Sequence, residues 1–153
     1  MTQSRPNMQI MQQLGQAIVK SKGFKDAAQQ VCRVLRKELA HYHWVGVYMV
    51  RGDKLVLEAW DGPQPTQHTE IGIGEGICGL AAREAKSVIV DDVNKDPRYL
   101  QCFLQTKAEI VVPIFRGKKV IGEIDVDSDK LAAFNALDRQ FLEWVADLLS
   151  QTA

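Results

Sequence analysis

The stretch Gly-Glu-Ile-Asp-Val-Asp-Ser at residues 122–128 constrains the fold more than any other part of the chain. Successive side chains of a β-strand point to opposite faces. A strand here therefore places Asp125 and Asp127 on one face, and Ile124 and Val126 on the other. Two like charges this close together favour a nearby cation. The pattern predicts a sheet with one apolar face, and the two aspartates either face solvent or line a pocket for a positive group.

A second strand precedes this one and contributes a third acid. Residues 109–115 are rich in apolar and β-branched side chains, residues 116–119 (Arg-Gly-Lys-Lys) have the composition of a turn, and residues 120–126 complete a hairpin. We expect these two strands to form the centre of the sheet. The first of them carries Glu109, seven residues after Cys102, so an acid and a thiol lie close together in the sequence.

The remaining segments predict helices at both ends of the chain around antiparallel strands, which is an α+β fold. Apolar residues recur at helical spacing in the N-terminal and C-terminal segments. Glycines punctuate the middle of the chain and predict tight turns there. The other predicted elements are helices over residues 7–22 and 24–39, a hairpin of strands 43–50 and 54–59, a helix over 77–85, a strand over 87–90, and a last helix that begins at Asn135.

Length and charge exclude several classes of protein. A chain of 153 residues has room for one hydrophobic core, and we expect a single domain over residues 1–153. The 19 basic and 19 acidic residues cancel, so no overall field favours nucleic acid or an anionic membrane surface. No apolar run approaches the length of a membrane span, and the first residues lack the apolar centre of a signal peptide. These features predict a cytoplasmic protein.

The cysteines do not form a structural framework, so any thiol chemistry in this chain would have to be catalytic. They are three in number, at positions 32, 78 and 102, and are spread widely along the chain. This pattern predicts no disulfide framework, and no Cys-x-x-Cys pair or matching histidine spacing indicates zinc. We therefore expect no metal and no bound cofactor. Cys32, on an amphipathic helix, is expected to be a packed core thiol.

Five segments that together span nearly the whole chain resemble a GAF domain. The resemblance implies a single GAF domain over residues 1–153, with a central antiparallel sheet, terminal helices packed on one face and a ligand pocket on the other. GAF pockets serve many functions, so the fold alone implies no particular ligand. The segments are Trp-Val-Gly-Val-Tyr from Trp44, Gly-Glu-Gly-Ile-Cys-Gly from Gly74, Asp-Pro-Arg-Tyr from Asp96, Glu-Ile-Val-Val-Pro from Glu109, and Ile-Gly-Glu-Ile-Asp-Val-Asp-Ser from Ile121.

Within that family, a single-domain chain of this length is similar to the free methionine-(R)-sulfoxide reductases. The resemblance implies that Cys102 is the nucleophile and Cys78 a second redox cysteine, with thioredoxin as the electron donor. At the position of a further cysteine of those reductases this chain carries His68, and the run around Cys102 is closer to sensory GAF domains. The residues implied to contact the substrate are Glu109, Asp125, Asp127, Trp44 and Tyr48.

The chemistry of sulfoxide reduction suits this set of residues. A thiolate must attack the sulfur, an acid must protonate the departing oxygen, and a second thiol must resolve the resulting sulfenic acid into a disulfide. The ammonium group of a free amino acid would neutralise the clustered carboxylates. Its methyl group and sulfur would suit an indole face such as that of Trp44.

A structural role is the alternative for each of these residues. Cys78 and Cys102 could be structural thiols, and Trp44 and Tyr48 could be ordinary core or pocket-wall aromatics. The alternative function is a sensory or regulatory GAF domain whose acidic pocket holds a small cationic or amino-acid-like ligand. In either case, surplus apolar residues on the first helix, over residues 7–22, predict a homodimer.

Overall fold

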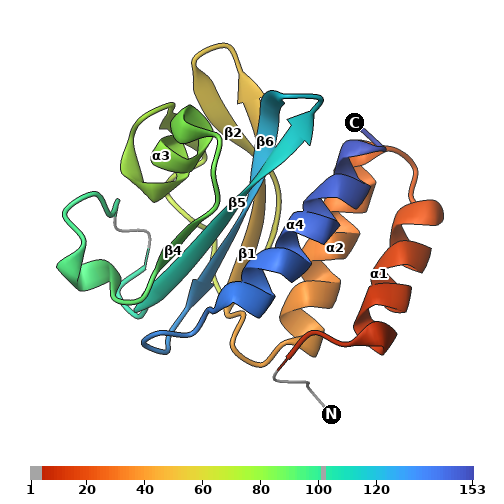
Figure 1. Ribbon diagram of the computed structural model, residues 1–153, viewed down its shortest axis with the longest axis horizontal. Helices are drawn as coiled ribbons and strands as arrows, with labels where there is room; N and C mark the ends of the chain where they lie inside the picture. Colours follow the sequence, from red (N-terminus) through yellow and green to blue (C-terminus); the bar gives the residue numbers. More distant parts are fainter. Residues whose placement is uncertain (1–4, 101–102) are drawn as a thin grey trace.

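The structure, a computed structural model, describes residues 5–100 and 103–153 and has an α+β architecture around one six-stranded sheet (Figure 1). The helices of the described residues are α1 (Met8–Val19), α2 (Phe24–Glu38), α3 (Gly76–Glu84) and α4 (Ala136–Ser150), with a short 3₁₀ helix at Val93–Lys95. The strands are β1 (Trp44–Arg51), β2 (Lys54–Asp61), β3 (Glu70–Gly72), β4 (Val88–Val90), β5 (Ala108–Arg116) and β6 (Lys119–Ser128).

All neighbouring strands are antiparallel, in the order β3-β2-β1-β6-β5-β4. Both predicted hairpins are confirmed, β1 with β2 and β5 with β6. The predicted centre is correct for β6 and wrong for β5, because β1 pairs with the other edge of β6 and moves β5 one place outward. The strand β3 and the 3₁₀ helix were not predicted, since each has a single apolar residue among its three, whereas all three residues of β4 are apolar.

The N-terminal and C-terminal helices cover one face of the sheet, and α3 covers the other (Figure 1). The terminal-helix face holds the larger core, in which Ile124 and Val126 of β6 pack with buried residues of α1, α2 and α4. The helix α1 packs on α2 and α4 and forms an outer layer. It ends at Val19, earlier than predicted, because the chain turns into α2 through Gly23, whose φ is +103°.

The last helix begins where the sequence predicts it. The Asn135 side chain accepts hydrogen bonds from the backbone N–H groups of Leu137 and Asp138, and the Asp138 carboxylate accepts one from the N–H of Asn135. This reciprocal capping box satisfies N–H groups that the first turn leaves without intrahelical partners. None of the helices in the described parts of the chain combines the length and apolar character needed to cross a membrane.

Candidate functional site

Two neighbouring strands, β5 and β6, bring the predicted acids onto the face of the sheet that α3 covers. The strand β6 lies between β1 and β5. In register, Asp127 lies between Trp44 of β1 and Glu109 of β5, while Asp125 lies opposite Gly46. The alternation of β6 therefore points both aspartates away from the terminal helices. The sequence-based prediction that they share one face is confirmed, and they are buried there and not solvated.

A fourth acid, Glu123, continues the same row and was missed by sequence reasoning. It lies opposite Tyr48 of β1, and none of its surface is exposed (0%). The signal was present in the sequence, because Glu123 precedes Asp125 by two residues in the same alternating strand. Glu123, Asp125 and Asp127 of β6 and Glu109 of β5 are together called the acidic row below.

Burial favours the neutral form of three members of the acidic row. Its four side chains belong to residues that are at most 3% exposed. Burial raises the pKa of Glu123, Asp125 and Asp127, and the charge of Asp125 raises the pKa of Glu123 and Asp127 further. The site therefore favours neutral carboxyl groups, which can donate protons, until a cation arrives to stabilise the charged forms.

Several oxygens of the acidic row lack hydrogen-bond partners among the described residues. They are both carboxyl oxygens of Glu123, both of Asp127, and Oδ1 of Asp125. Burial raises the pKa of Asp127, and the nearby Glu109 side chain offsets part of that rise. Neither oxygen of Asp127 has a hydrogen-bond partner among the described residues. A buried polar atom without a partner costs free energy, so such a group in a native fold calls for a functional explanation.

The helix α3 places Cys78 over the acidic row. The Cys78 Sγ, one carboxyl oxygen of Glu109 and one of Asp125 all lie within 4.8 Å of one another. This approach depends on Gly79, because a Cβ there would overlap the backbone of Gly72 and hold α3 away from the sheet. The structure thus brings together a thiol and two acids that lie far apart in the sequence.

Cys102 lies outside the described residues, so its predicted role stays a prediction. The described residues on either side of residues 101–102 both line cavities of the site. Leu100 lines a cavity of about 10 Å³ together with Cys78 and Glu109. Phe103 packs against Trp44, with ring centroids 5.7 Å apart.

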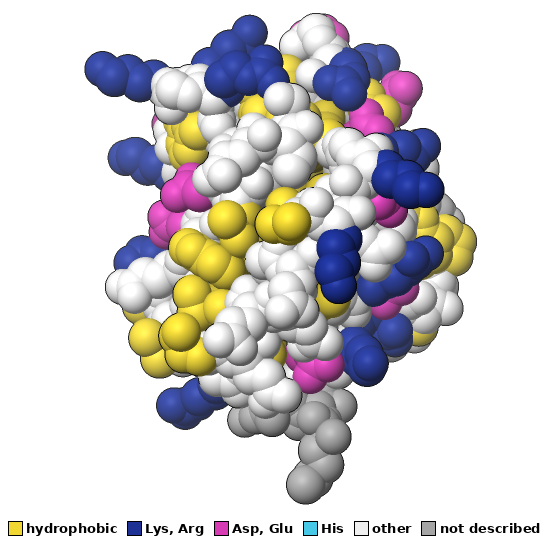
Figure 2. Space-filling model, turned by 90° about the vertical axis from the view of Figure 1, so that its right-hand side faces the viewer, with side chains coloured by type: hydrophobic (Ala, Val, Ile, Leu, Met, Phe, Trp, Pro, Cys, Tyr) yellow, Lys and Arg dark blue, Asp and Glu magenta, His cyan; other side chains and the backbone are white. Residues whose placement is uncertain are grey.

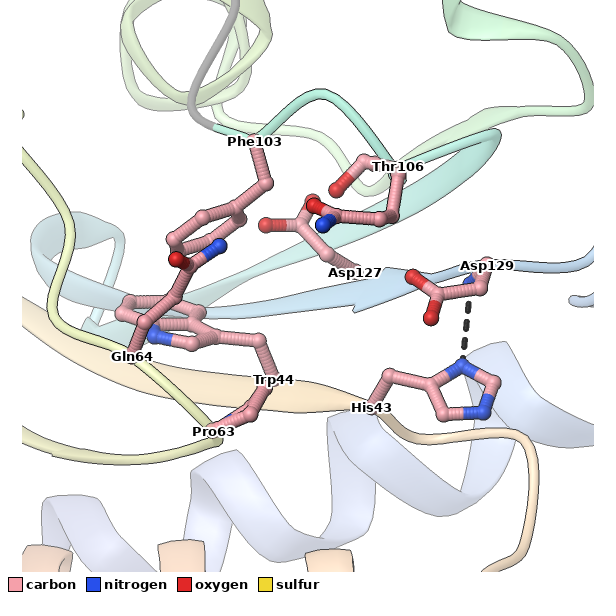
Figure 3. A pocket seen from close by; sticks show the side chains of 9 residues that line it. His43, Trp44, Pro63, Gln64, Phe103, Thr106, Asp127 and Asp129 are labelled. Carbon is pink, nitrogen blue, oxygen red and sulfur yellow. Dashed lines mark hydrogen bonds between the residues drawn. The ribbon is translucent and has the colours of Figure 1, made fainter.

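Trp44 forms one wall of a larger cavity, of about 210 Å³ (Figure 3). Its ring is nearly parallel to that of Trp60, with an interplanar angle of 12° and centroids 6.3 Å apart. A Cβ at Gly46 or at Gly62 would overlap the Trp44 indole, so these glycines make room for it. Asp127 is the member of the acidic row that reaches this cavity. The lining residues are His43, Trp44, Pro63, Gln64, Phe103, Gln105, Thr106, Asp127 and Asp129.

His43 was not predicted from the sequence, and the structure places it at the edge of this cavity. Its Nδ1 accepts a hydrogen bond of 2.9 Å from the backbone N–H of Asp129, drawn as a dashed line in Figure 3. A neutral imidazole that accepts at Nδ1 carries its proton on Nε2. The strand end of β6 thereby sets the orientation and the tautomer of this ring.

Tyr48 lies beside the acidic row and does not line the larger cavity. Its hydroxyl donates a hydrogen bond of 2.7 Å to the backbone carbonyl of His68. The segment between β2 and β3 is thereby held against the sheet. The other predicted aromatic residue, Trp44, is the one placed at the cavity wall.

The antiparallel sheet, with terminal helices on one face and buried acids beside a cavity on the other, defines the class of protein, an α+β domain with a candidate ligand site. The family model of the GAF domain matches residues 24–153. The chain belongs to the GAF domain family. The fold and the family predicted from the sequence are both confirmed.

Two free methionine-R-sulfoxide reductases of known structure are similar to this chain. The type II enzyme from Thermoplasma acidophilum is 42% identical with a TM-score of 0.80, over 84% of this chain and 94% of that one. The enzyme from Neisseria meningitidis, solved in complex with its substrate, is 28% identical with a TM-score of 0.87, over 99% and 94%. The GAF domain-containing protein A of Dictyostelium discoideum is 40% identical over 74% of this chain and 71% of its own length.

Proposed function

We propose that this protein reduces free methionine-(R)-sulfoxide to methionine. The observation that carries the proposal is the meeting of Cys78, the acidic row and the Trp44 cavity on one face of the sheet. The likeness to two proteins named as reductases of this substrate supports it. A sensory GAF domain would need the acids for binding but would need no thiol beside them.

The free amino acid suits this site by charge and by shape. Its ammonium group can neutralise Asp127 and Asp125, whose burial otherwise favours their neutral forms, and Glu109 lies beside them. Its methyl group and sulfur can pack on the Trp44 indole at the cavity wall. A methionine sulfoxide within a polypeptide has no free ammonium, so the acidic row would select the free amino acid.

The proposed reaction has three steps. The Cys102 thiolate attacks the sulfoxide sulfur, the sulfur–oxygen bond of the substrate breaks, and the oxygen passes with one proton to Cys102 as a sulfenic acid while methionine leaves. A neutral carboxyl of the acidic row supplies that proton. The Cys78 thiol then displaces water from the sulfenic acid and forms a disulfide. A thioredoxin dithiol reduces the disulfide by thiol–disulfide exchange.

The chain around Cys102 supports its part in this scheme. Phe103, the next residue along the chain, packs on Trp44, and both line the cavity that Asp127 reaches. Leu100, two residues before Cys102, lines the small cavity beside Cys78. The nucleophile and the resolving thiol are therefore proposed to meet above the acidic row.

We also propose a homodimer that works in the cytoplasm with thioredoxin and without a bound cofactor. Figure 2 looks onto the helix side of the molecule, where hydrophobic side chains form a band between lysine and arginine side chains. Met8 and Val19, at the two ends of α1, are 69% and 85% exposed on this side, and a second copy of the chain would cover them. Sedimentation equilibrium measures the mass, and a monomer at micromolar concentration would contradict the dimer.

The proposal predicts thioredoxin-dependent NADPH oxidation with free methionine-(R)-sulfoxide. The (S) epimer and a peptide-bound sulfoxide are expected to give no turnover above background. Cys102→Ser is expected to bind substrate but to release no methionine, because serine is a far weaker nucleophile at neutral pH. The matched control is Cys32→Ala, which removes a thiol buried in the core on the terminal-helix face.

Two results would count against the reductase. Well-folded, reduced protein that gives no turnover, yet binds methionine sulfoxide through Asp127, would favour the sensory GAF domain. Full turnover by Cys102→Ser would show that the nucleophile lies elsewhere.

A further inference from the structure

Cys78, Glu109 and Asp125 form a compact set of metal-ligand atoms from three different elements. One ligand atom of each residue lies within 4.8 Å of the other two, and all three residues are buried. In tetrahedral coordination, Zn–S bonds of about 2.3 Å and Zn–O bonds of about 2.1 Å place the ligand atoms roughly 3.4–3.6 Å apart. Small side-chain rotations would therefore bring all three onto one ion.

A second observation points to a cation at this place. Oδ1 of Asp125 and both oxygens of the adjacent Glu123 are buried and have no hydrogen-bond partner among the described residues. Their burial among other acids is unfavourable unless positive charge is added. Glu123 lies in the same row of β6 as Asp125, so a further buried carboxyl group lies beside the set.

Two members of the set, Cys78 and Glu109, line a small cavity. The cavity next to Cys78 and Glu109 has a volume of about 10 Å³, which is close to one water-sized sphere. A single divalent cation fits a space of this size.

The donor set favours zinc over the harder cations. Mg²⁺ prefers six oxygen ligands with several waters, and Ca²⁺ prefers six to eight oxygens. One thiolate with two carboxylates suits a borderline cation with four ligands. With three ligands from the protein, the fourth position stays open for water or for a substrate group.

We propose that Cys78, Glu109 and Asp125 bind one Zn²⁺ ion, and that zinc at this site inhibits the enzyme reversibly. The inhibition rests on the proposed reductase function, whereas metal binding does not. Binding replaces the thiol proton of Cys78, and any proton held by the two carboxyl groups, by the metal, so protons are released and no electron moves. The bound ion blocks the resolving thiol and holds two of the carboxylates proposed to receive the substrate ammonium.

Cobalt provides a test that does not depend on activity. Fully reduced protein without a histidine tag is titrated with Co²⁺, and we expect one equivalent to produce a thiolate-to-cobalt charge-transfer band in the near ultraviolet. Zn²⁺ is expected to abolish the band by displacing Co²⁺. Cys78→Ser should lose the band, and Asp125→Asn and Glu109→Gln should each weaken Zn²⁺ binding by about 100-fold or more in competition with a chelating dye.

The controls are the other two thiols. Cys32→Ala and Cys102→Ser are expected to keep the band and the one-to-one stoichiometry. Loss of the band in Cys102→Ser with its retention in Cys78→Ser would overturn the assignment. An absence of any cobalt–thiolate band in the reduced protein would overturn it as well.

A separate assay tests inhibition. We expect Zn²⁺ to inhibit competitively with methionine sulfoxide and a chelator to restore full turnover. A protein that binds cobalt but shows no reductase activity would contradict the proposed function and leave the metal site standing. Uninhibited turnover with zinc bound would overturn the inhibitory role.

Discussion

Cys78→Ser is expected to form one methionine per chain and then stop, with steady-state turnover lowered on the order of 10³-fold. In the proposed reaction the substrate is reduced before Cys78 acts, so the first product does not need this thiol. Resolution of the sulfenic acid does need it. Cys32 cannot substitute, because it belongs to the core on the opposite face of the sheet and burial raises the pKa of its thiol.

Product counting separates this prediction from a structural role for Cys78. Reduced protein is mixed with excess free methionine-(R)-sulfoxide without thioredoxin, and methionine is quantified after quenching. The wild-type chain and Cys78→Ser should each give about one equivalent. Only the variant should retain a sulfenic acid that a dimedone-type reagent traps. A variant that recycles with thioredoxin at the wild-type rate would remove Cys78 from the mechanism.

Asp127→Asn is expected to weaken catalysis and to strengthen the fold. Loss of one buried charged partner for the substrate ammonium should lower kcat/KM by about 10²- to 10³-fold. The same change replaces a buried carboxyl without a hydrogen-bond partner by a neutral amide. Removal of that cost should raise the free energy of unfolding by about 1 kcal/mol at neutral pH. A fall in kcat/KM together with a rise in the free energy of unfolding identifies a binding residue, whereas loss of a structural residue would lower both.

The pH dependence of stability gives a sharper form of this prediction. The folded-state pKa of Asp127 is raised, so the folded chain holds the proton more tightly than the unfolded chain. The carboxyl therefore favours the fold most below its unfolded-state pKa, and that contribution is lost as the pH rises through the folded-state value. The stability gained in Asp127→Asn should accordingly be small near pH 4 and larger toward pH 8.

Urea unfolding of both proteins across this pH range measures the effect. Asp129→Asn is the matched control, because its exposed carboxyl lies two residues further along and lines the same cavity. We expect its stability to stay within about 0.5 kcal/mol of the wild type. A pH-independent difference between Asp127→Asn and the wild type would contradict the raised pKa.

Local patterns predicted most of the elements. The strand β6 followed from its alternation, and α4 followed from Asn135 and Asp138, because both signals lie within a few residues. The position of β5 did not follow, since nothing in its own residues shows that β1 pairs with the other edge of β6. Glu123 was visible in the alternation, but its burial without a hydrogen-bond partner depends on the segments that cover it.

The sequence by itself determined that Asp125 and Asp127 share one face of a strand, because side-chain alternation is a property of the strand alone. It also determined the α+β class and the GAF resemblance, which rest on local motifs and their order. Only the tertiary structure decided that Cys78 lies over Glu109 and Asp125, and that Trp44 lines a cavity with Asp127. Those contacts join residues far apart in the chain, and they depend on strand register and on how closely α3 approaches the sheet.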